Sequence, residues 1–417
     1  MLKKIFSYFL ILFNLWLPTP QATATDLMIR AQDDTTIQGL KLTLKISPSL
    51  PLQEGPSGYG IEVISNGPRA FKDAQGNFMS YNCYRDARGR IIVNPQQPSL
   101  YRFLFSKPVD QMPFFDDVSA FGTVGVVFNM YEKDLQSLTG YDRFQQRWNT
   151  RGTVKIYPHT TKEQFKNLYP RKNYDNYYQN AFYDNHPTAG HVLCFFPMRD
   201  QENQYTSQSF DVVAHEAGHN VLNILRPDVR NSPNSDRRAF HESFGDMTAI
   251  FAALTFRQLR EKVLQETGDD LHKPSFLSVV GERIANRDAA QATHLSFHPS
   301  CEAHRLSERL TKALYGILAD YYDLSRISLE EVSVSFRRLF FKTILNSNLS
   351  TFIDFGRSLK ENTSSLVFQK LIFENFAKQG IDLRKIPQTL QVCIPETHPV
   401  KAAKCSTIQM SRKTLLN

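Results

Sequence analysis

The hydrophobic and polar positions of this 417-residue chain follow different patterns along its length. Residues 25 to about 112 alternate apolar and polar positions between Gly, Pro and Asn residues, as in GYGIEVISNGPRAF and RGRIIVNPQQPSLYRFLF. This alternation predicts short antiparallel strands. Helix and strand patterns mix from about residue 120, and helical spacing dominates after Ala303. We therefore expect a strand-rich lobe followed by a mainly helical lobe, since the chain is long enough for two.

Two helices in the second half have clear end signals. SLEEVSVSFRRLFFKTIL opens with Ser328 and Glu331 at the spacing of a capping box. SSLVFQKLIFENFAKQG finishes on Gly380, a residue type that commonly ends helices. The apolar positions that share one face of the first helix are Val332, Phe336, Leu339 and Phe340.

The N-terminus has the features of an export signal. Lys3 and Lys4 precede an apolar run over residues 5–17, and Ala22-Thr23-Ala24 supplies the small residues of a cleavage site. These features predict a secretory signal peptide over residues 1–24. No second long apolar segment follows, so we expect no integral membrane segment. The predicted location is secreted: extracellular, or periplasmic in a bacterium.

Charge and cysteine content narrow the function classes. The formal net charge is +8, but no basic cluster is interleaved with aromatic residues, so nucleic acid is not an expected partner. The five cysteines are widely spaced and form no CxxC pair, which argues against a thiolate zinc site. Export permits a disulfide, for which Cys393 with Cys405 is the favoured pair. We expect Cys194 to be a buried thiol that packs as a small apolar residue.

The segment DVVAHEAGHN contains the HExxH pattern of zinc hydrolases. His215 and His219 lie four positions apart, so on a helix both imidazoles can face one ion. Glu216 then lies beside the metal without having to bind it. The alternative is a chance HExxH on an ordinary amphipathic helix, but the apolar residues on both sides favour a buried helix.

A third metal ligand is needed, and carboxylates supply the candidates. Leu222 and Leu225 replace the glycine and histidine of the extended metzincin motif, which excludes that class. Glu242 and Asp246 lie four apart in RRAFHESFGDMTAIFAALT, so one can bind zinc while the other orients a ligand histidine. His241 is rotated by about 100° from Glu242 on a helix, so we expect it to face a loop or to lie behind the ligands.

Together these motifs resemble the thermolysin family, in which HExxH is followed by a helix with ExxxD. The segment 211–216 is similar to the family's entry into the zinc helix, and NAFYD at 180–184 resembles its substrate-binding edge strand. EAHRLSERLTKALYGIL at 302–318 is similar to the segment with the family's catalytic histidine, here His304. NFAKQGI at 375–381 resembles the end of its last helix, so the resemblance covers about residues 114–382.

The resemblance implies an α+β, thermolysin-like fold with the HExxH helix at the floor of a cleft between two lobes. It implies a zinc-dependent endopeptidase that hydrolyses peptide bonds of protein or peptide substrates. The expected segments are a signal peptide (1–24), a strand-rich N-terminal segment (25–112), an N-terminal catalytic lobe (113–225), a helical C-terminal catalytic lobe (226–382) and a polar tail (383–417). The implied roles are zinc binding by His215, His219 and Glu242, proton transfer by Glu216, orientation of a ligand by Asp246, oxyanion stabilisation by His304, and substrate binding by Asn180 and Ala181.

Other positions refine this picture. Val212 and Val280 match the family's pocket for the residue after the cut bond, which implies cleavage before bulky apolar residues. Glu282 matches one calcium ligand of the family, but Ala253 replaces another acidic ligand. Calcium binding is therefore left open, and the family's double calcium site is not predicted. The loop before Glu242 has no tyrosine where the family has one.

Two other functions remain open on the sequence. An aminopeptidase would use the same zinc helix, but no acidic motif that anchors a substrate N-terminus precedes it. A catalytically weakened zinc-binding secreted protein, acting as a binding or toxin-like factor, is compatible with the absent tyrosine and calcium acid. Peptidase activity with and without a chelator separates an enzyme from a binding protein.

Overall fold

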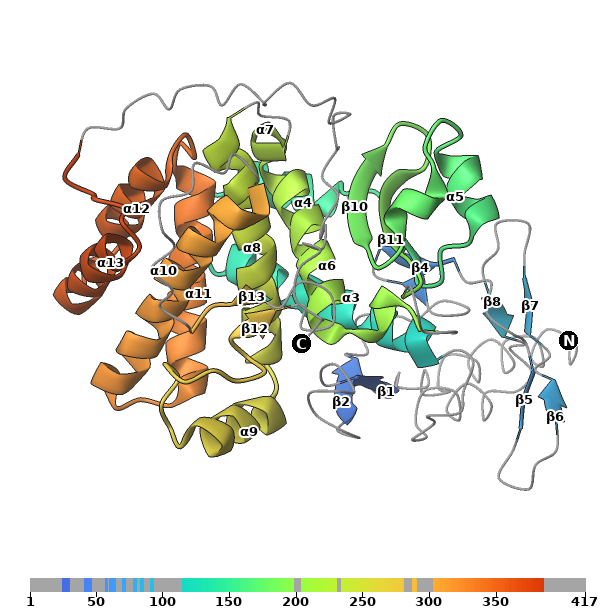
Figure 1. Ribbon diagram of the computed structural model, residues 1–417, viewed down its shortest axis with the longest axis horizontal. Helices are drawn as coiled ribbons and strands as arrows, with labels where there is room; N and C mark the ends of the chain where they lie inside the picture. Colours follow the sequence, from blue (N-terminus) through green and yellow to red (C-terminus); the bar gives the residue numbers. More distant parts are fainter. Residues whose placement is uncertain are drawn as a thin grey trace, which may run out of the picture.

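The computed structural model describes residues 25–30, 41–46, 57–58, 60–64, 70–72, 78–80, 83–85, 91–93, 115–198, 204–230, 234–280, 287–290 and 303–385. These residues form a mixed α/β structure in which helices predominate over a small sheet (Figure 1). The predicted signal peptide, the Cys393–Cys405 pair, Glu282 and the tail from residue 386 lie outside the described residues.

Short strands occupy the N-terminal part, as its alternating pattern predicts. Three hairpins are antiparallel: β1 (Thr25–Arg30) with β2 (Lys41–Ile46), β5 (Ala70–Lys72) with β6 (Phe78–Ser80), and β7 (Cys83–Arg85) with β8 (Ile91–Val93). A fourth antiparallel pair joins β3 (Ser57–Gly58) to β4 (Ile61–Val63).

The largest described sheet has five strands in the order β10-β11-β9-β4-β3. It combines that fourth pair with β9 (Val154–Tyr157), β10 (Ala181–His186) and β11 (Gly190–Phe195). β10 and β11 are antiparallel, whereas β9 runs parallel to both β11 and β4. The parallel pairing of β4 was not expected from the sequence.

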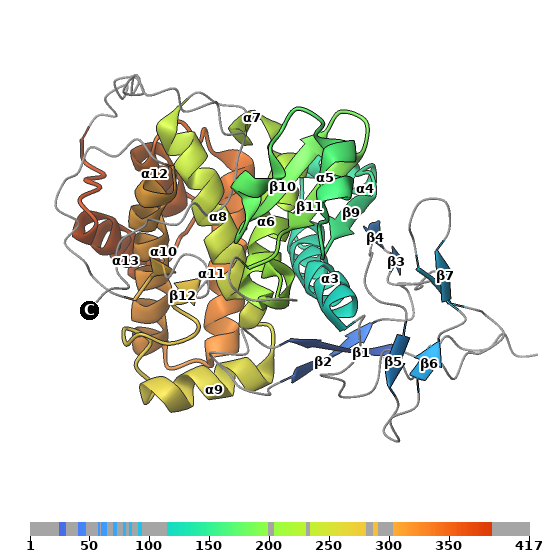
Figure 2. The same cartoon turned by 45° about the vertical axis from the view of Figure 1, so that its right-hand side comes forward.

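The helices surround a central pair, α6 (Phe210–Leu225) and α8 (Ser235–Ala253), which pack against each other. The sheet lies on one side of this pair and helices α10–α13 on the other in both views (Figures 1 and 2). The other long helices are α3 (Phe115–Gln136), α10 (Ala303–Ser325), α11 (Leu329–Asn346), α12 (Phe352–Glu361) and α13 (Leu366–Lys378). The shorter elements are α4 (Asp142–Asn149), α5 (Lys162–Leu168), α7 (Pro227–Arg230), α9 (Arg257–Thr267), β12 (Val279–Val280) and β13 (Arg287–Asp288).

The predicted helix ends are confirmed. Ser328 and Glu331 form both hydrogen bonds of a capping box at the start of α11. The predicted apolar face of α11 is turned inward, with Leu339 partly buried and its other members fully buried. Gly380 follows α13 at a φ of 70°, where its amide donates to the Ala377 carbonyl. A positive φ favours glycine, so this residue ends the helix as expected.

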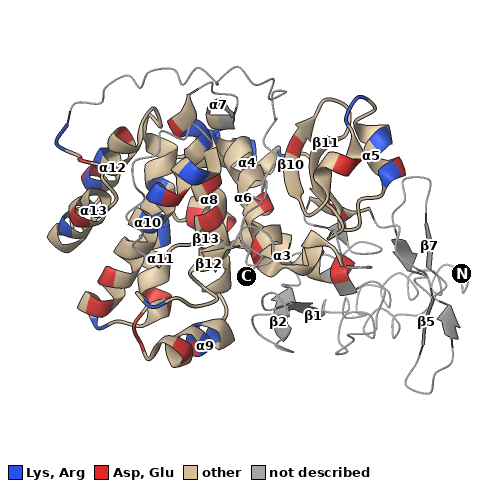
Figure 3. Cartoon of the chain, in the orientation of Figure 1, with Lys and Arg blue, Asp and Glu red and all other residues tan. Residues whose placement is uncertain are grey.

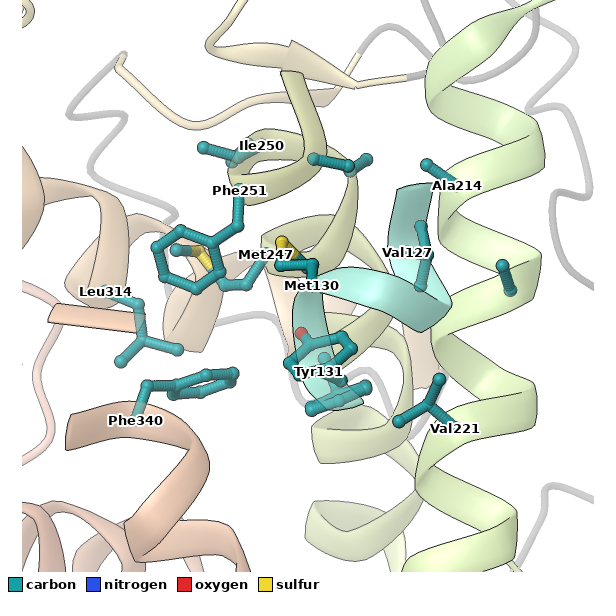
Figure 4. Close-up of a cluster of buried hydrophobic side chains, with 14 of the residues drawn as sticks. Val127, Met130, Tyr131, Ala214, Val221, Met247, Ile250, Phe251, Leu314 and Phe340 are labelled. Carbon is teal, nitrogen blue, oxygen red and sulfur yellow. The ribbon is translucent and has the colours of Figure 1, made fainter. Parts of the chain in front are cut away.

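The main hydrophobic core lies between α3, α6, α8, α10 and α11 (Figure 4). Tyr131 of α3 is at its centre and stacks on Phe244 of α8, with ring centroids 5.4 Å apart. Thr248 donates its hydroxyl proton to the Phe244 carbonyl, so the Tyr131 hydroxyl is the donor in their 2.8 Å hydrogen bond. This bond gives a buried polar group of the core a partner and joins α3 to α8.

Acidic and basic residues occur together on most of the described helices, whereas the buried α6 has only the acidic residues Asp211 and Glu216. Blue and red ribbon segments are interspersed over the helices (Figure 3). Among the described helices we find no candidate for a membrane span, because none is both long enough and apolar enough. Cys194 is a buried thiol outside any disulfide, as expected.

Candidate metal centre

Helix α6 presents the HExxH residues inside the protein. Its first turn includes Asp211, whose carboxylate accepts a 2.9 Å bond from the Val212 amide at the electropositive end of the helix. Every residue of α6 is buried. His215, Glu216 and His219 present ligand atoms that all lie within 4.8 Å of one another. This part of the helix is therefore a polar cluster enclosed by the core.

Helix α8 brings Glu242 to both histidines. Its Oε2 atom lies 3.4 Å from Nε2 of His215 and 3.5 Å from Nε2 of His219. All three side chains are 1% exposed. These separations are longer than the usual 2.7–3.2 Å of a direct hydrogen bond, taken as a rough range. They suit three ligand atoms arranged around one cation.

Unpaired polar atoms support the same reading. Within the described part of the chain, neither carboxylate oxygen of Glu216 and neither ring nitrogen of His219 has a hydrogen-bond partner. Leaving buried polar atoms unpaired is unfavourable, and such atoms are rare in folded proteins. A bound metal ion beside them would offset this cost, so the residues present fit such an ion.

The electrostatics keep Glu242 ionised. Burial alone would raise the pKa of this carboxyl, but the neighbouring His304, His219 and His215 together outweigh burial and hold that pKa well below its usual range. A carboxylate must be deprotonated to bind a metal ion.

Asp246 contacts the other ring nitrogen of His215. Its Oδ1 atom lies 3.0 Å from Nδ1 of His215, which leaves Nε2 of that ring directed toward Glu242. A carboxylate at this position fixes the tautomer and the orientation of an imidazole ligand. Thr311 of α10 hydrogen-bonds Ser243 at 3.0 Å and Asp246 at 3.3 Å. Thr311 was not identified from the sequence, because no local spacing relates it to a residue on α8.

His304 also lies at the cluster. It is in the first turn of α10, with its Nε2 atom 3.4 Å from Oε2 of Glu242 and its side chain 20% exposed. Ser307 donates its hydroxyl to the His304 carbonyl at 2.7 Å. The His304 imidazole is far more exposed than the side chains of His215, His219 and Glu242. It therefore borders the cluster from the solvent side.

His241 differs from its expected placement. The prediction that it faces a loop is wrong: it is buried and its ring stacks on His219, with centroids 4.2 Å apart and planes 22° apart. Its ligand atom lies within 4.8 Å of those of His219 and Glu242. Two consecutive residues of α8 face α6 because the two helices pack closely. The alternative expectation is that His241 packs behind the metal ligands. This placement describes the buried ring stacked on His219 better.

Asn180 and Ala181 lie at a sheet edge, but they are not exposed. β10 ends the order of the five-stranded sheet, as the substrate-binding role requires. Asn180 is 4% exposed and Ala181 is fully buried, contrary to the expectation of an open edge. The Asn180 side chain accepts a 2.9 Å bond from the Ala181 amide, and its carbonyl accepts bonds from the Phe196 amide and the Thr206 hydroxyl. The hydrogen-bonding groups of this corner are thus partly used within the protein.

Comparisons with known proteins add little to this geometry. No family model matches the chain, and no curated protein matches it. Nine chains among solved structures match. One is the precursor of protealysin, a metalloproteinase from Serratia proteamaculans, with 13% identity and a TM-score of 0.45 over 77% of this chain and 87% of that chain. At this identity and TM-score the likeness assigns neither fold nor activity.

Proposed function

We propose that the protein is an exported zinc-dependent endopeptidase. The observation that carries the proposal is the position of the Glu242 carboxylate, 3.4 and 3.5 Å from the Nε2 atoms of His215 and His219. Ligand atoms about 2.0–2.2 Å from a tetrahedral zinc ion lie about 3.3–3.5 Å apart. Two histidines and one carboxylate also leave the open position that a catalytic zinc site needs.

A bound zinc would act as a Lewis acid toward the attacking water and the scissile carbonyl. Glu216, on the same helix as both histidines, accepts the proton of the water and later delivers it to the leaving amine. His304 donates a hydrogen bond to the oxygen that becomes negative. Asp246 holds the ring of His215 through Nδ1, so that Nε2 keeps its direction.

Export and substrate preference belong to the proposal. Export is supported by the sequence pattern of residues 1–24. The preference for a bulky apolar residue after the cut bond rests on the resemblance alone, through Val212 and Val280, which match the positions of the family's pocket. Mapping of cleavage sites on a peptide library measures the preference, and a preference for charged residues would contradict it.

The decisive experiment measures zinc content and proteolysis of the same preparations. The purified chain is expected to hold about one zinc and to cleave an unstructured protein, with activity lost in a chelator and restored by zinc. Glu242→Ala should lose most of the metal. Glu216→Gln should retain the metal and the fold but lose nearly all activity, because the proton acceptor is absent.

A matched control separates this effect from the general effect of a Glu-to-Gln change. Glu374 lies on the surface of α13, and its side chain is 45% exposed. Glu374→Gln should therefore leave activity unchanged. Near-normal turnover in Glu216→Gln would refute the mechanism. Full zinc occupancy in Glu242→Ala would move the third ligand to another residue, first of all His241, which lies beside the ligands.

A second candidate is a zinc-binding secreted protein without turnover. Burial of Asn180 and Ala181 favours it, because an extended peptide needs an open strand edge on which to add. The two candidates differ in one result: a zinc-loaded chain that cleaves no peptide in the library is a binding protein.

A further inference from the structure

Gly245 lies under the ring of His215. A Cβ atom built on Gly245 would lie 2.6 Å from Cε1, 2.7 Å from Nδ1 and 2.8 Å from Nε2 of that imidazole. Three ring atoms at nearly equal distances mean that the ring presents its face to the glycine. Real side chains do not approach a Cβ this closely, so alanine would force the ring or the helix to move.

Other contacts keep the ring of His215 where it is. Its Nδ1 atom lies 3.0 Å from Asp246, and its Nε2 atom lies 3.4 Å from Glu242. The ring also meets His219 edge to face, with centroids 4.5 Å apart and planes 81° apart. A ring that turned away from a new methyl group would change at least one of these contacts.

The helices cannot easily separate instead. A Cβ on Gly218 of α6 would lie 2.7 Å from the Thr248 hydroxyl of α8, so the two backbones approach closely at a second point. Thr248 is further held by Tyr131 of the core and by its own bond to the Phe244 carbonyl. The space between α6 and α8 at His215 is therefore set by fixed packing.

We infer that Gly245 is a positioning residue of the metal centre: its missing side chain makes the space in which the His215 imidazole lies between Glu242 and Asp246. One turn of α8 then supplies the ligand Glu242, the glycine against which the His215 ring packs, and the Asp246 carboxylate that orients this ring. The inference rests on the proposed metal function. A glycine in the middle of a helix costs about 1 kcal/mol relative to alanine, so its presence here needs such a reason.

The first test measures the dissociation constant of Zn²⁺ for the full chain by competition with a chromophoric chelator. Gly245→Ala is expected to weaken binding by about 10- to 100-fold, the usual effect of disturbing the support of a metal ligand. Gly125→Ala is the neutral control, because a Cβ there meets nothing within 4 Å. Gly316→Ala is the control for strain, because Gly316 lies twelve residues further along α10 than His304 and its Cβ would collide with Asn375 of α13.

Gly316→Ala should lower thermal stability but keep the zinc affinity of the wild type. Gly245→Ala should lower both. A folded Gly245→Ala variant that binds Zn²⁺ within twofold of the wild type would overturn the inference.

The second test uses chelator-treated protein and needs no metal. Gly245→Ala should lower the urea midpoint when His215 is present. In the His215→Ala background the ring is gone, so the same change should leave the midpoint equal or raise it, because alanine favours the helix. Equal decreases in both backgrounds would show that His215 is not the neighbour that matters and overturn the inference. A wild type without zinc binding would overturn the proposed function, while a change of sign between backgrounds would still establish the contact.

Discussion

The ion pair between Asp134 and Arg337 gives the clearest stability prediction. Arg337 donates from Nε to Oδ2 at 2.6 Å and from Nη2 to Oδ1 at 3.0 Å, which joins α3 to α11. The Asp134 side chain is 1% exposed and that of Arg337 is 8% exposed. Arg338 also reaches Oδ1 of Asp134 at 3.4 Å, but its side chain is 52% exposed. Two adjacent arginines thus contact one carboxylate in different environments.

Arg337→Leu removes both short bonds and leaves the Asp134 carboxylate buried. Breaking a buried pair on one side costs about 3–5 kcal/mol, and we expect the lower end because Arg338 remains nearby. In a chain of this size about 3 kcal/mol lowers the melting temperature by roughly 3–4 °C. Arg338→Leu removes an exposed partner and should cost at most about 1 kcal/mol.

Urea and thermal unfolding, followed by circular dichroism on the full chain, measure both values. The double variant Asp134→Leu/Arg337→Leu should recover much of the loss, because no charge then stays buried without a partner. An exposed ion pair contributes at most about 1 kcal/mol. A free energy of unfolding for Arg337→Leu that lies within about 1 kcal/mol of the wild-type value would therefore refute the assignment of a buried, stabilising pair. So would equal losses for Arg337→Leu and Arg338→Leu.

Other predictions concern the metal centre and the surface. Asp246→Ala should weaken Zn²⁺ binding by about 10- to 100-fold, as measured by chelator competition, and unchanged affinity would deny it an orienting role. His304→Ala should lower turnover by about 100- to 1000-fold with zinc content unchanged, and loss of zinc would make it a ligand instead. His272 has a pKa raised above 6.5 chiefly by its hydrogen bond to Asp320, so its stabilisation is fully present below pH 6.5 and is lost as pH rises through the raised value. His272→Gln should therefore lower the free energy of unfolding by less than about 1 kcal/mol, because the ring is 41% exposed, and only in the more acidic range. An equal loss at alkaline pH would contradict this.

The local part of the site was predictable because helical spacing is a local property. Residues four apart on one helix share a face, so the sequence alone indicated that His215 and His219 would meet, and that Glu242 and Asp246 would point the same way. The structure brings the four side chains together. The position of His304 depended on the resemblance to a family, since no spacing rule connects the first turn of α10 with α8.

The remaining features depend on how closely elements pack, which spacing does not reveal. The rotation of about 100° between His241 and Glu242 does not keep the two side chains apart, because both reach His219 of the closely packed partner helix. The signal for that close packing was the glycine before Asp246, inside a segment otherwise suited to a helix. The burial of Asn180 likewise depends on neighbours from β11 and the segment after it, which strand pattern alone cannot place.

The position of β4 bears on how the chain tolerates cleavage. Residues Ile61, Glu62 and Val63 pair in parallel with β9, and the Ile64 amide donates to the Ile156 carbonyl at 2.7 Å. Ile61 and Val63 are at most 2% exposed, so their side chains are part of the core. If a protease cut the chain between residues 64 and 115, the segment 60–64 would keep these contacts without a covalent link to β9. Complete removal of that segment would turn β9 from an inner strand into an open edge, where a strand from another molecule can add.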